Sequence, residues 1–146
     1  MDFDLELRSA VYRHFADTAR APALDDISRA MRVPPDDVKA AYARLFAKRM
    51  LVPMPDGESI RMAPPFSGVP TQHRVRANGK EYFANCAWDS FGIPAALHAD
   101  AEVLSRCEQT HEPLHVRLGP EGPPPSTWWF HVAVPAVHWW RDIVYT

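Results

Sequence analysis

Proline is the residue that most restricts how this chain can fold. Fifteen prolines occur among its 146 residues. Proline fixes the backbone angle φ and lacks an N–H group, so it interrupts helices and central strands. We therefore expect short helices and strands joined by rigid turns. The proline-rich stretch 63–70 is expected to join two halves, a domain at 1–63 and a domain at 70–146.

Apolar residues at helical spacing predict three helices in the first half, at 3–20, 24–32 and 37–49. Two strands are expected next, at 51–54 and 59–62, on either side of a Pro-Asp-Gly-Glu turn. Three helices followed by a two-stranded hairpin form the winged-helix arrangement. Its second and third helices would make a helix-turn-helix.

The third expected helix leaves two interpretations open. It could enter the major groove of DNA, or the whole unit could be structural. Asp36 and Asp37 stand at the start of this helix, where they would repel phosphates. Four basic residues partly offset this repulsion: Lys39, Arg44, Lys48 and Arg49. The net charge of −2, with no block of like charges, also argues against DNA as a partner.

The second half begins with a predicted β-hairpin. Strands at 73–77 and 80–83 flank an Asn-Gly pair, the strongest short hairpin signal. The apolar run 84–98 is expected to be a buried helix, although it contains Pro94, which could kink it. Two further strands are predicted at 101–107 and 114–118.

The C-terminal stretch is rich in aromatic residues. Residues 128–134 favour a strand because aromatic and β-branched side chains fit pleated sheets. Residues 137–145 could form a helical turn that passes into a strand. Four tryptophans are expected in the core or in the wall of a pocket, in preference to a cage for a cation: Trp128, Trp129, Trp139 and Trp140.

The predicted fold class is therefore α+β. A winged-helix-like unit of three helices at 1–63 would be followed at 70–146 by a mixed β-sheet unit. The second unit would hold a buried helix that carries Cys86 and Asp89.

Cys86 and Asp89 stand three residues apart in the predicted helix, so they share one face. A thiol and an acid in apolar surroundings can support soft-metal or nucleophilic chemistry. A plainer interpretation is also open. Cys86 could be only a small apolar side chain, while Asp89 bonds a backbone amide or a tryptophan indole to offset its burial.

Cys107 and His131 are the other candidate ligands. Zinc sites usually need about four nitrogen or sulfur ligands, and no closely spaced cysteine pair is present. Cys86, Cys107, His111 and His131 could form such a site only if the fold brings them together. Otherwise Cys107 is expected to be a buried structural thiol. His131 lies among aromatic residues near the end of a predicted strand.

An aromatic run with a proline surrounds Cys86-Ala87-Trp88-Asp89, and Cys107 follows before a polar turn and an alternating strand. With a winged-helix-like half in front, this order of parts resembles the alkylmercury lyase (organomercurial lyase) family. In that family two cysteine thiolates hold mercury, and an aspartate handles the proton given to the leaving carbon. The resemblance implies that Cys86 and Asp89 are catalytic and contact the metal, and that Cys107 is a structural thiol.

The chain departs from the family at the second catalytic cysteine. The family places it after the proline-rich loop, where this chain has Ser126 to His131 without a cysteine. Cys107, His131 or a residue beyond Thr146 could replace it. The resemblance implies a small organometallic or thiol-reactive substrate, with mercury as substrate or ligand and no resident cofactor. The alternative is a non-catalytic sensor of metals or electrophiles that signals through its winged helix.

The expected location is the cytoplasm. No apolar run approaches the roughly 20 residues that span a bilayer, and the acidic start Met1-Asp2-Phe3-Asp4 is unlike a signal peptide. We therefore expect no membrane partner. Both cysteines are expected to be reduced in that compartment.

Overall fold

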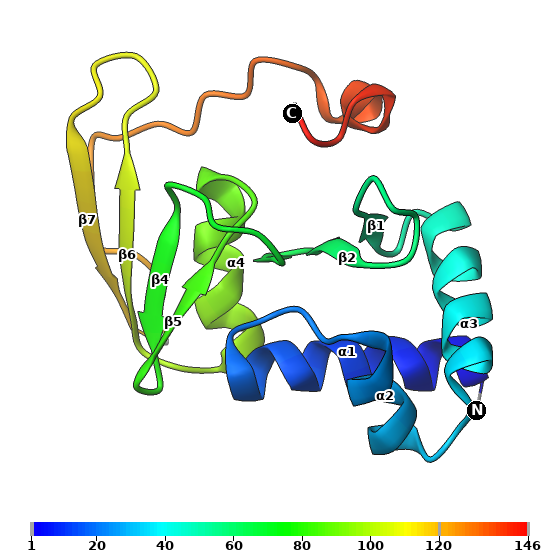
Figure 1. Ribbon diagram of the computed structural model, residues 1–146. Helices are drawn as coiled ribbons and strands as arrows, with labels where there is room; N and C mark the ends of the chain where they lie inside the picture. The colour runs from blue at the N-terminus through cyan, green and yellow to red at the C-terminus, as the bar shows by residue number, and fades with distance from the viewer. Residues whose placement is uncertain (1, 120, 146) are drawn as a thin grey trace.

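A computed structural model describes residues 2–119 and 121–145 as a mixed α+β fold with antiparallel sheets (Figure 1). The helices are α1 (Phe3–Thr18), α2 (Leu24–Met31), α3 (Pro35–Ala47), α4 (Ala87–Leu97) and a 3-10 helix, η1 (Ala136–Arg141). The strands are β1 (Val52–Pro53), β2 (Ile60–Ala63), β3 (Phe66–Ser67), β4 (Arg74–Ala77), β5 (Lys80–Phe83), β6 (Ala101–Arg106) and β7 (Pro113–Leu118). Among the helices described, none is long and apolar enough to cross a membrane.

The first three helices form where the sequence predicts them. Asp2 caps α1 by accepting a hydrogen bond from the backbone N–H of Asp4, at 3.0 Å. Pro35 occupies the first turn of α3, where a missing N–H is tolerated. Val11, Val38 and Leu45 are fully buried between these helices. The α+β class is thus observed, whereas the winged-helix character of this unit stays a prediction.

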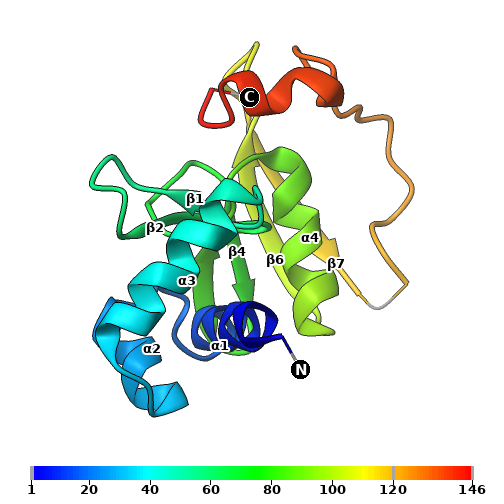
Figure 2. The same ribbon diagram turned by 90° about the vertical axis from the view of Figure 1, so that its right-hand side faces the viewer.

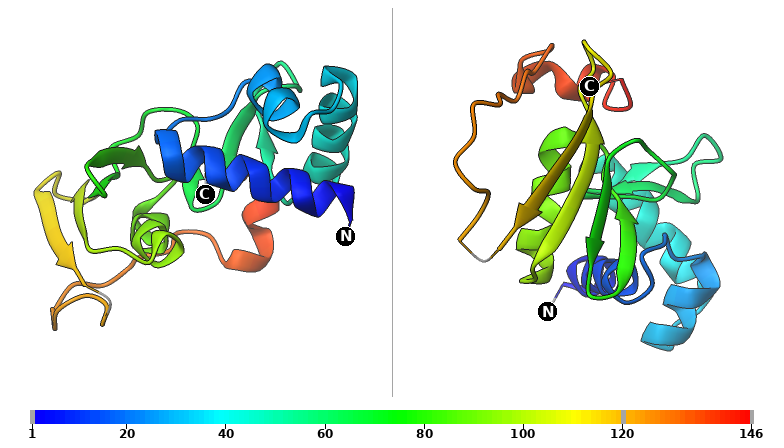
Figure 3. Two further views of the ribbon diagram at one scale, coloured as in Figure 1. Left: turned by 90° about the horizontal axis from the view of Figure 1, so that it is seen from below. Right: turned by 90° about the vertical axis from the view of Figure 1, so that its left-hand side faces the viewer.

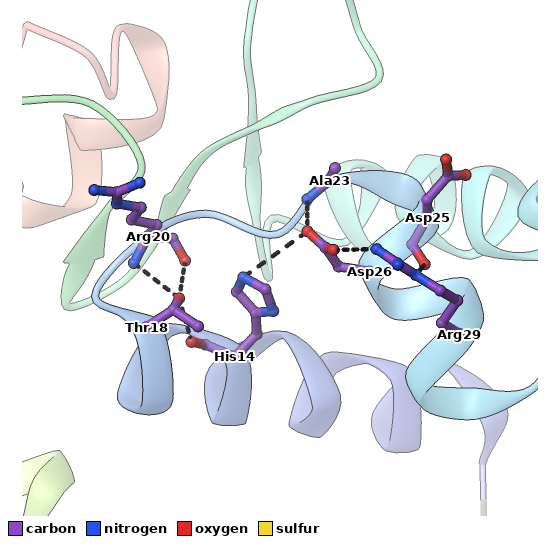
Figure 4. A network of polar contacts seen from close by, with 7 residues as sticks. All are labelled: His14, Thr18, Arg20, Ala23, Asp25, Asp26 and Arg29. Atoms are coloured by element: carbon purple, nitrogen blue, oxygen red, sulfur yellow. Dashed lines mark hydrogen bonds and ion pairs between the residues drawn. The ribbon is translucent and has the colours of Figure 1, made fainter.

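The loop between α1 and α2 is held by a polar network around Asp26 (Figure 4). Its carboxylate accepts from the N–H of Ala23 at 2.9 Å and pairs with Arg29 at 2.8 Å. The imidazole of His14, on α1, lies 4.0 Å from the same carboxylate. The bond from Ala23 is the first cause that lowers the pKa of Asp26. The network therefore joins the end of α1 to the start of α2.

The predicted linker at 63–70 contains a short strand. Residues 66–67 form β3, which pairs with β2 in a three-stranded sheet of order β1-β2-β3. Phe66 is buried and stacks on Phe15 with ring centres 5.4 Å apart. Its ring also meets those of Tyr12 and, from the second half, Tyr82. Side chains of both halves thus share one apolar core, and the division at 63–70 stays a prediction.

The second sheet is antiparallel, with strand order β5-β4-β6-β7. The predicted β4–β5 hairpin is confirmed, and its Asn78-Gly79 turn has the positive φ angles that such a turn needs. Helix α4 lies along one face of this sheet (Figure 3). Val75, Val103 and Val116 are buried in one row across three strands. Burial of Ile93 from α4 against this face contributes about 1.5–3 kcal/mol.

The C-terminal stretch corrects several predictions. No strand forms at 128–134; the chain is extended there and runs beside α4 before reaching η1 (Figure 2). The strand expected at the end of 137–145 is also absent, since turns follow η1. Trp129 is 94% exposed and so lies outside the core, but together with Trp128 it lines a cavity, which agrees with the expected place in the wall of a pocket. Aromatic strand propensity reflects packing on a pleated surface, and this segment pairs with no strand in the described chain.

Candidate active site

Cys86 occupies the N-cap of α4, the position just before the first helical residue. Its backbone is extended, with φ −151° and ψ 179°, and its sulfur accepts a hydrogen bond from the backbone N–H of Asp89 at 3.4 Å. Serine, threonine, aspartate or asparagine usually fill this role. Here the thiol does so, and it stands half-buried at the positive end of the helix dipole.

Asp89 lies in the first turn of α4, and its half-buried carboxylate accepts a hydrogen bond from the side-chain amide of Asn85 at 2.9 Å. The same amide donates to the carbonyl oxygens of Pro65 and Phe66, each at 3.3 Å. Asn85 therefore holds the acid against the β2–β3 turn. The carboxylate thus has a side-chain amide as its partner, where the sequence suggested a backbone amide or an indole.

Burial favours the neutral form of both candidate groups. Removal from water raises the pKa of the Asp89 carboxyl, and the hydrogen bond from Asn85 only partly opposes this. Burial also raises the pKa of the Cys86 thiol, against a smaller lowering by the backbone N–H of Asp89. The resting site therefore places a thiol beside a carboxylic acid that retains its proton to higher pH than usual.

Cys107 lies elsewhere, in the turn after β6. Its N–H donates to the carbonyl of Glu112 at 2.9 Å, and its own carbonyl accepts from the N–H of His111 at 2.8 Å. The thiol is half-buried, not buried as expected. A hydrogen bond from the side chain of Thr110, aided by the backbone N–H groups of Thr110 and Gln109, lowers its pKa.

His131 is exposed in the extended C-terminal segment. Nowhere in the described chain do three His, Cys, Asp or Glu side chains gather closely enough to hold a metal ion. The structure thus brings Cys86 and Asp89 together but joins neither His131 nor Cys107 to them as a metal-binding trio.

Sequence reasoning missed Asn85 and Gly92. Asn85 stands four residues before Asp89, a helical spacing that could have identified it as a partner. Gly92 stands one turn after Asp89, and a Cβ added there would lie 3.0 Å from the Cβ of Pro65. Glycine at position 92 therefore permits the close approach of α4 to the β2–β3 turn. No pattern in the sequence predicts this contact.

Phe130 is a further contact that the sequence did not indicate. Its ring meets those of Trp88 and Phe91 edge to face, with centres 5.4 and 5.0 Å apart. This aromatic cluster attaches the C-terminal segment to α4. The backbone of that segment passes along the same side of the molecule as α4 (Figure 2). The C-terminal segment therefore lies beside the helix that begins after Cys86.

Residues 66–146 match the alkylmercury lyase (MerB) family. This match spans α4, both cysteines and the C-terminal segment. The chain belongs to the alkylmercury lyase family. The family that the sequence resembles is thereby confirmed.

Individual relatives support this membership over shorter stretches. Alkylmercury lyases of Bacillus cereus and Clostridium butyricum are each 32% identical to the chain over 53 residues. That alignment covers 36% of this chain and spans about a quarter, 24%, of each relative. The mercury-bound form of MerB2 has a similar fold, with a TM-score of 0.65 and 23% identity over 84% of this chain and 60% of that one.

Proposed function

We propose that the chain cleaves carbon–mercury bonds by protonolysis, with Cys86 as the mercury ligand and Asp89 as the proton donor. One observation carries this proposal. The sulfur of Cys86 is hydrogen-bonded to the backbone of Asp89, whose half-buried carboxyl has a raised pKa. Membership of the alkylmercury lyase family supports the same chemistry.

The first step is capture of an organomercury cation by Cys86. A sulfur–mercury bond forms, and the thiol proton leaves to water. Thiolates suit soft metals, so the new bond compensates for the raised pKa of this thiol. The N-terminal dipole of α4 helps to hold the developing negative charge on sulfur.

The second step moves one proton. The carboxylic acid of Asp89 gives its proton to the mercury-bound carbon as the carbon–mercury bond breaks. The hydrocarbon leaves, and mercury(II) stays on Cys86. Asp89 becomes a carboxylate that can approach the metal, and the amide of Asn85 is already placed to donate to it. An acid with a raised pKa suits this role because it keeps its proton to higher pH than an ordinary aspartic acid does.

Mercury(II) prefers a second soft ligand, and residues 126–131 contain no cysteine. We propose that a small thiol from solution completes the coordination and carries the metal away. His131 remains a candidate ligand within this chain, and Cys107 keeps its proposed structural role. Both cysteines are free in the structure, as the thiol chemistry requires and as a cytoplasmic location would favour.

The test is hydrocarbon release from an alkyl- or arylmercury compound in excess thiol. Asp89→Asn should lower turnover by at least about a hundredfold, the usual contribution of a general acid, yet still bind mercury at Cys86. Asp100→Asn, at an exposed site near β6, is the matched control and should match wild type. No hydrocarbon release by the wild-type chain would overturn the proposal.

We propose that the winged-helix-like unit supports the site and does not bind DNA. Its basic residues on and after α3 are already engaged. Arg44 and Lys48 pair with the buried carboxylate of Asp4, at 2.7 and 3.3 Å. Two more contacts follow: Lys39 pairs with Glu58, and Arg49 lies over the ring of Trp140.

These pairings count against the alternative of a DNA-reporting regulator, since cations already paired attract phosphates weakly. A low-salt DNA retention assay tests this point. We expect no retention of the full chain at low salt, where non-specific attraction is strongest. Clear retention of the chain on DNA that is lost with added salt would instead favour the DNA-reporting regulator.

A further inference from the structure

A cavity of about 470 Å³ lies between α4, the β6–β7 part of the sheet and the C-terminal segment. Phe91 forms one wall, Val103, Leu114 and Val116 form the floor, and Trp128 and Trp129 are on the third side. Small-molecule sites commonly have volumes of about 300–1,000 Å³ and apolar walls. The cavity therefore has the size and lining of a site for a small organic group.

The serine hydroxyls around this cavity are already hydrogen-bonded. Ser90 donates to the carbonyl of Ala87 at 2.6 Å, and Ser126 accepts from the N–H of Trp128 at 2.9 Å. Ser105 lies 2.7 Å from Nδ1 of the buried His73. The walls therefore offer a ligand mainly apolar and aromatic surface.

The charged side chains of β7 at the cavity also have partners. Arg117 donates to Glu102 at 3.2 Å, and the imidazole of His115 lies 3.8 Å from the same carboxylate. Glu102 thus offsets the positive charge that could attract an anion. The site consequently favours a neutral group over a charged one.

The two tryptophans are held at the cavity by their neighbour in sequence. Phe130 packs on Trp88 and Phe91, which fixes the segment on α4 and leaves Trp128 54% and Trp129 94% exposed. Exposure of two adjacent indoles leaves much apolar surface in water. A planar ligand that stacks on an indole would remove part of that surface from water.

We propose that this cavity binds a neutral aromatic group. Under the proposed function, on which this part of the inference rests, the group is the aryl substituent of an arylmercury substrate whose metal is held by Cys86. Ser90, on the cavity wall, stands one helical turn after Cys86 and so on the same side of α4. The cavity would then favour aryl over methyl substrates.

A probe without mercury separates this inference from the lyase proposal. Fluorobenzene is titrated into the full chain and followed by ¹⁹F NMR, with fluorocyclohexane as the non-aromatic probe of similar size. Wild type should bind fluorobenzene more tightly than fluorocyclohexane. Trp128→Ala should weaken fluorobenzene binding about threefold to tenfold, the size of one lost aromatic pair. Trp129→Ala is a second variant, should Trp128→Ala unfold.

Trp140→Ala is the matched control, because Trp140 lies on the same segment but contacts Arg49 instead of the cavity. It should bind fluorobenzene as wild type does. Equal binding of the two probes would overturn the inference, as would equal losses in Trp128→Ala and Trp140→Ala. Fluorobenzene binding that falls as protein concentration rises would do the same, since a second copy would then cover the cavity.

Turnover gives an independent comparison. Phenylmercury should be cleaved with a higher kcat/KM than methylmercury, and Trp128→Ala should reduce that ratio. Fluorobenzene binding without any turnover would sink the lyase proposal and leave the aromatic site standing. Turnover without fluorobenzene binding would overturn the aromatic site and support the lyase proposal.

Discussion

The two cysteines of this chain are both half-buried, yet their surroundings shift their acidities in opposite directions. At Cys86 burial raises the pKa, whereas at Cys107 hydrogen bonds led by Thr110 lower it. Reactive cysteines usually have a lowered pKa. Here the thiol beside the acid is the less acidic one. Capture of mercury at Cys86 would therefore be driven by the strength of the metal–sulfur bond and not by a resting thiolate.

The largest expected contrast is between two serine substitutions. Cys86→Ser should abolish hydrocarbon release, because a hydroxyl is a poor ligand for a soft metal. Cys107→Ser should keep turnover within about twofold of wild type, because substitutions away from the reacting groups usually have small effects. It should also lower Tm slightly. Gas chromatography of the released hydrocarbon and thermal melts measure both. Loss of soft-metal binding in a folded Cys107→Ser variant would show that Cys107 is a ligand.

Removal of Asn85 should change the pH profile of the reaction. Its hydrogen bond partly lowers the pKa of Asp89, so Asn85→Ala should raise that pKa further. The acid would keep its proton to higher pH, and the alkaline limb of the profile should move upward. The maximal rate should fall about tenfold, the usual effect of removing a residue that hydrogen-bonds a metal ligand. An unmoved limb, or an equal shift in Gln109→Ala, would contradict the assigned hydrogen bond.

Alkylation rates test the two thiols without any metal. Iodoacetamide reacts with thiolates, so at pH 7.5 Cys107 should be labelled several times faster than Cys86. Mass spectrometry of the two peptides gives both rates. Thr110→Ala removes the first cause of the lowered pKa and should slow labelling at Cys107 alone. Faster labelling of Cys86 than of Cys107 would show that Cys86 is the more acidic thiol, contrary to this prediction.

The smallest expected effect concerns stability. Asp89 has a folded-state pKa above its ordinary value, so its stability contribution is present at low pH and lost as pH rises through the folded pKa. Asp89→Asn should therefore raise Tm at pH 8 and leave it nearly unchanged at pH 4. Thermal melts at both pH values decide this. A lower Tm at pH 8 would mean that the carboxylate stabilises the fold.

Local patterns predicted the regular parts of the fold well. Helices α1 to α3 and the β4–β5 hairpin form at the predicted places, because apolar periodicity and the Asn78-Gly79 turn act over short distances. The strand at 128–134 failed for a non-local reason: strand formation needs a neighbouring strand to complete its hydrogen bonds. The spacing from Asn85 to Asp89 could have been recognised, but the contacts of Asn85 with Pro65 and Phe66 could not, because those residues are far away in sequence.

The close approach of Gly92 to Pro65 makes the position of the Cys86–Asp89 turn dependent on the turn between β2 and β3. A methyl group at Gly92 would lie 3.0 Å from the Cβ of Pro65, so Pro65 or the turn of α4 that carries Asp89 would have to shift by a few tenths of an ångström. The β2–β3 turn is thus a rigid stop that sets how deep the acid sits. Transplanting the Cys86–Asp89 turn into another scaffold would require this stop to be transplanted as well.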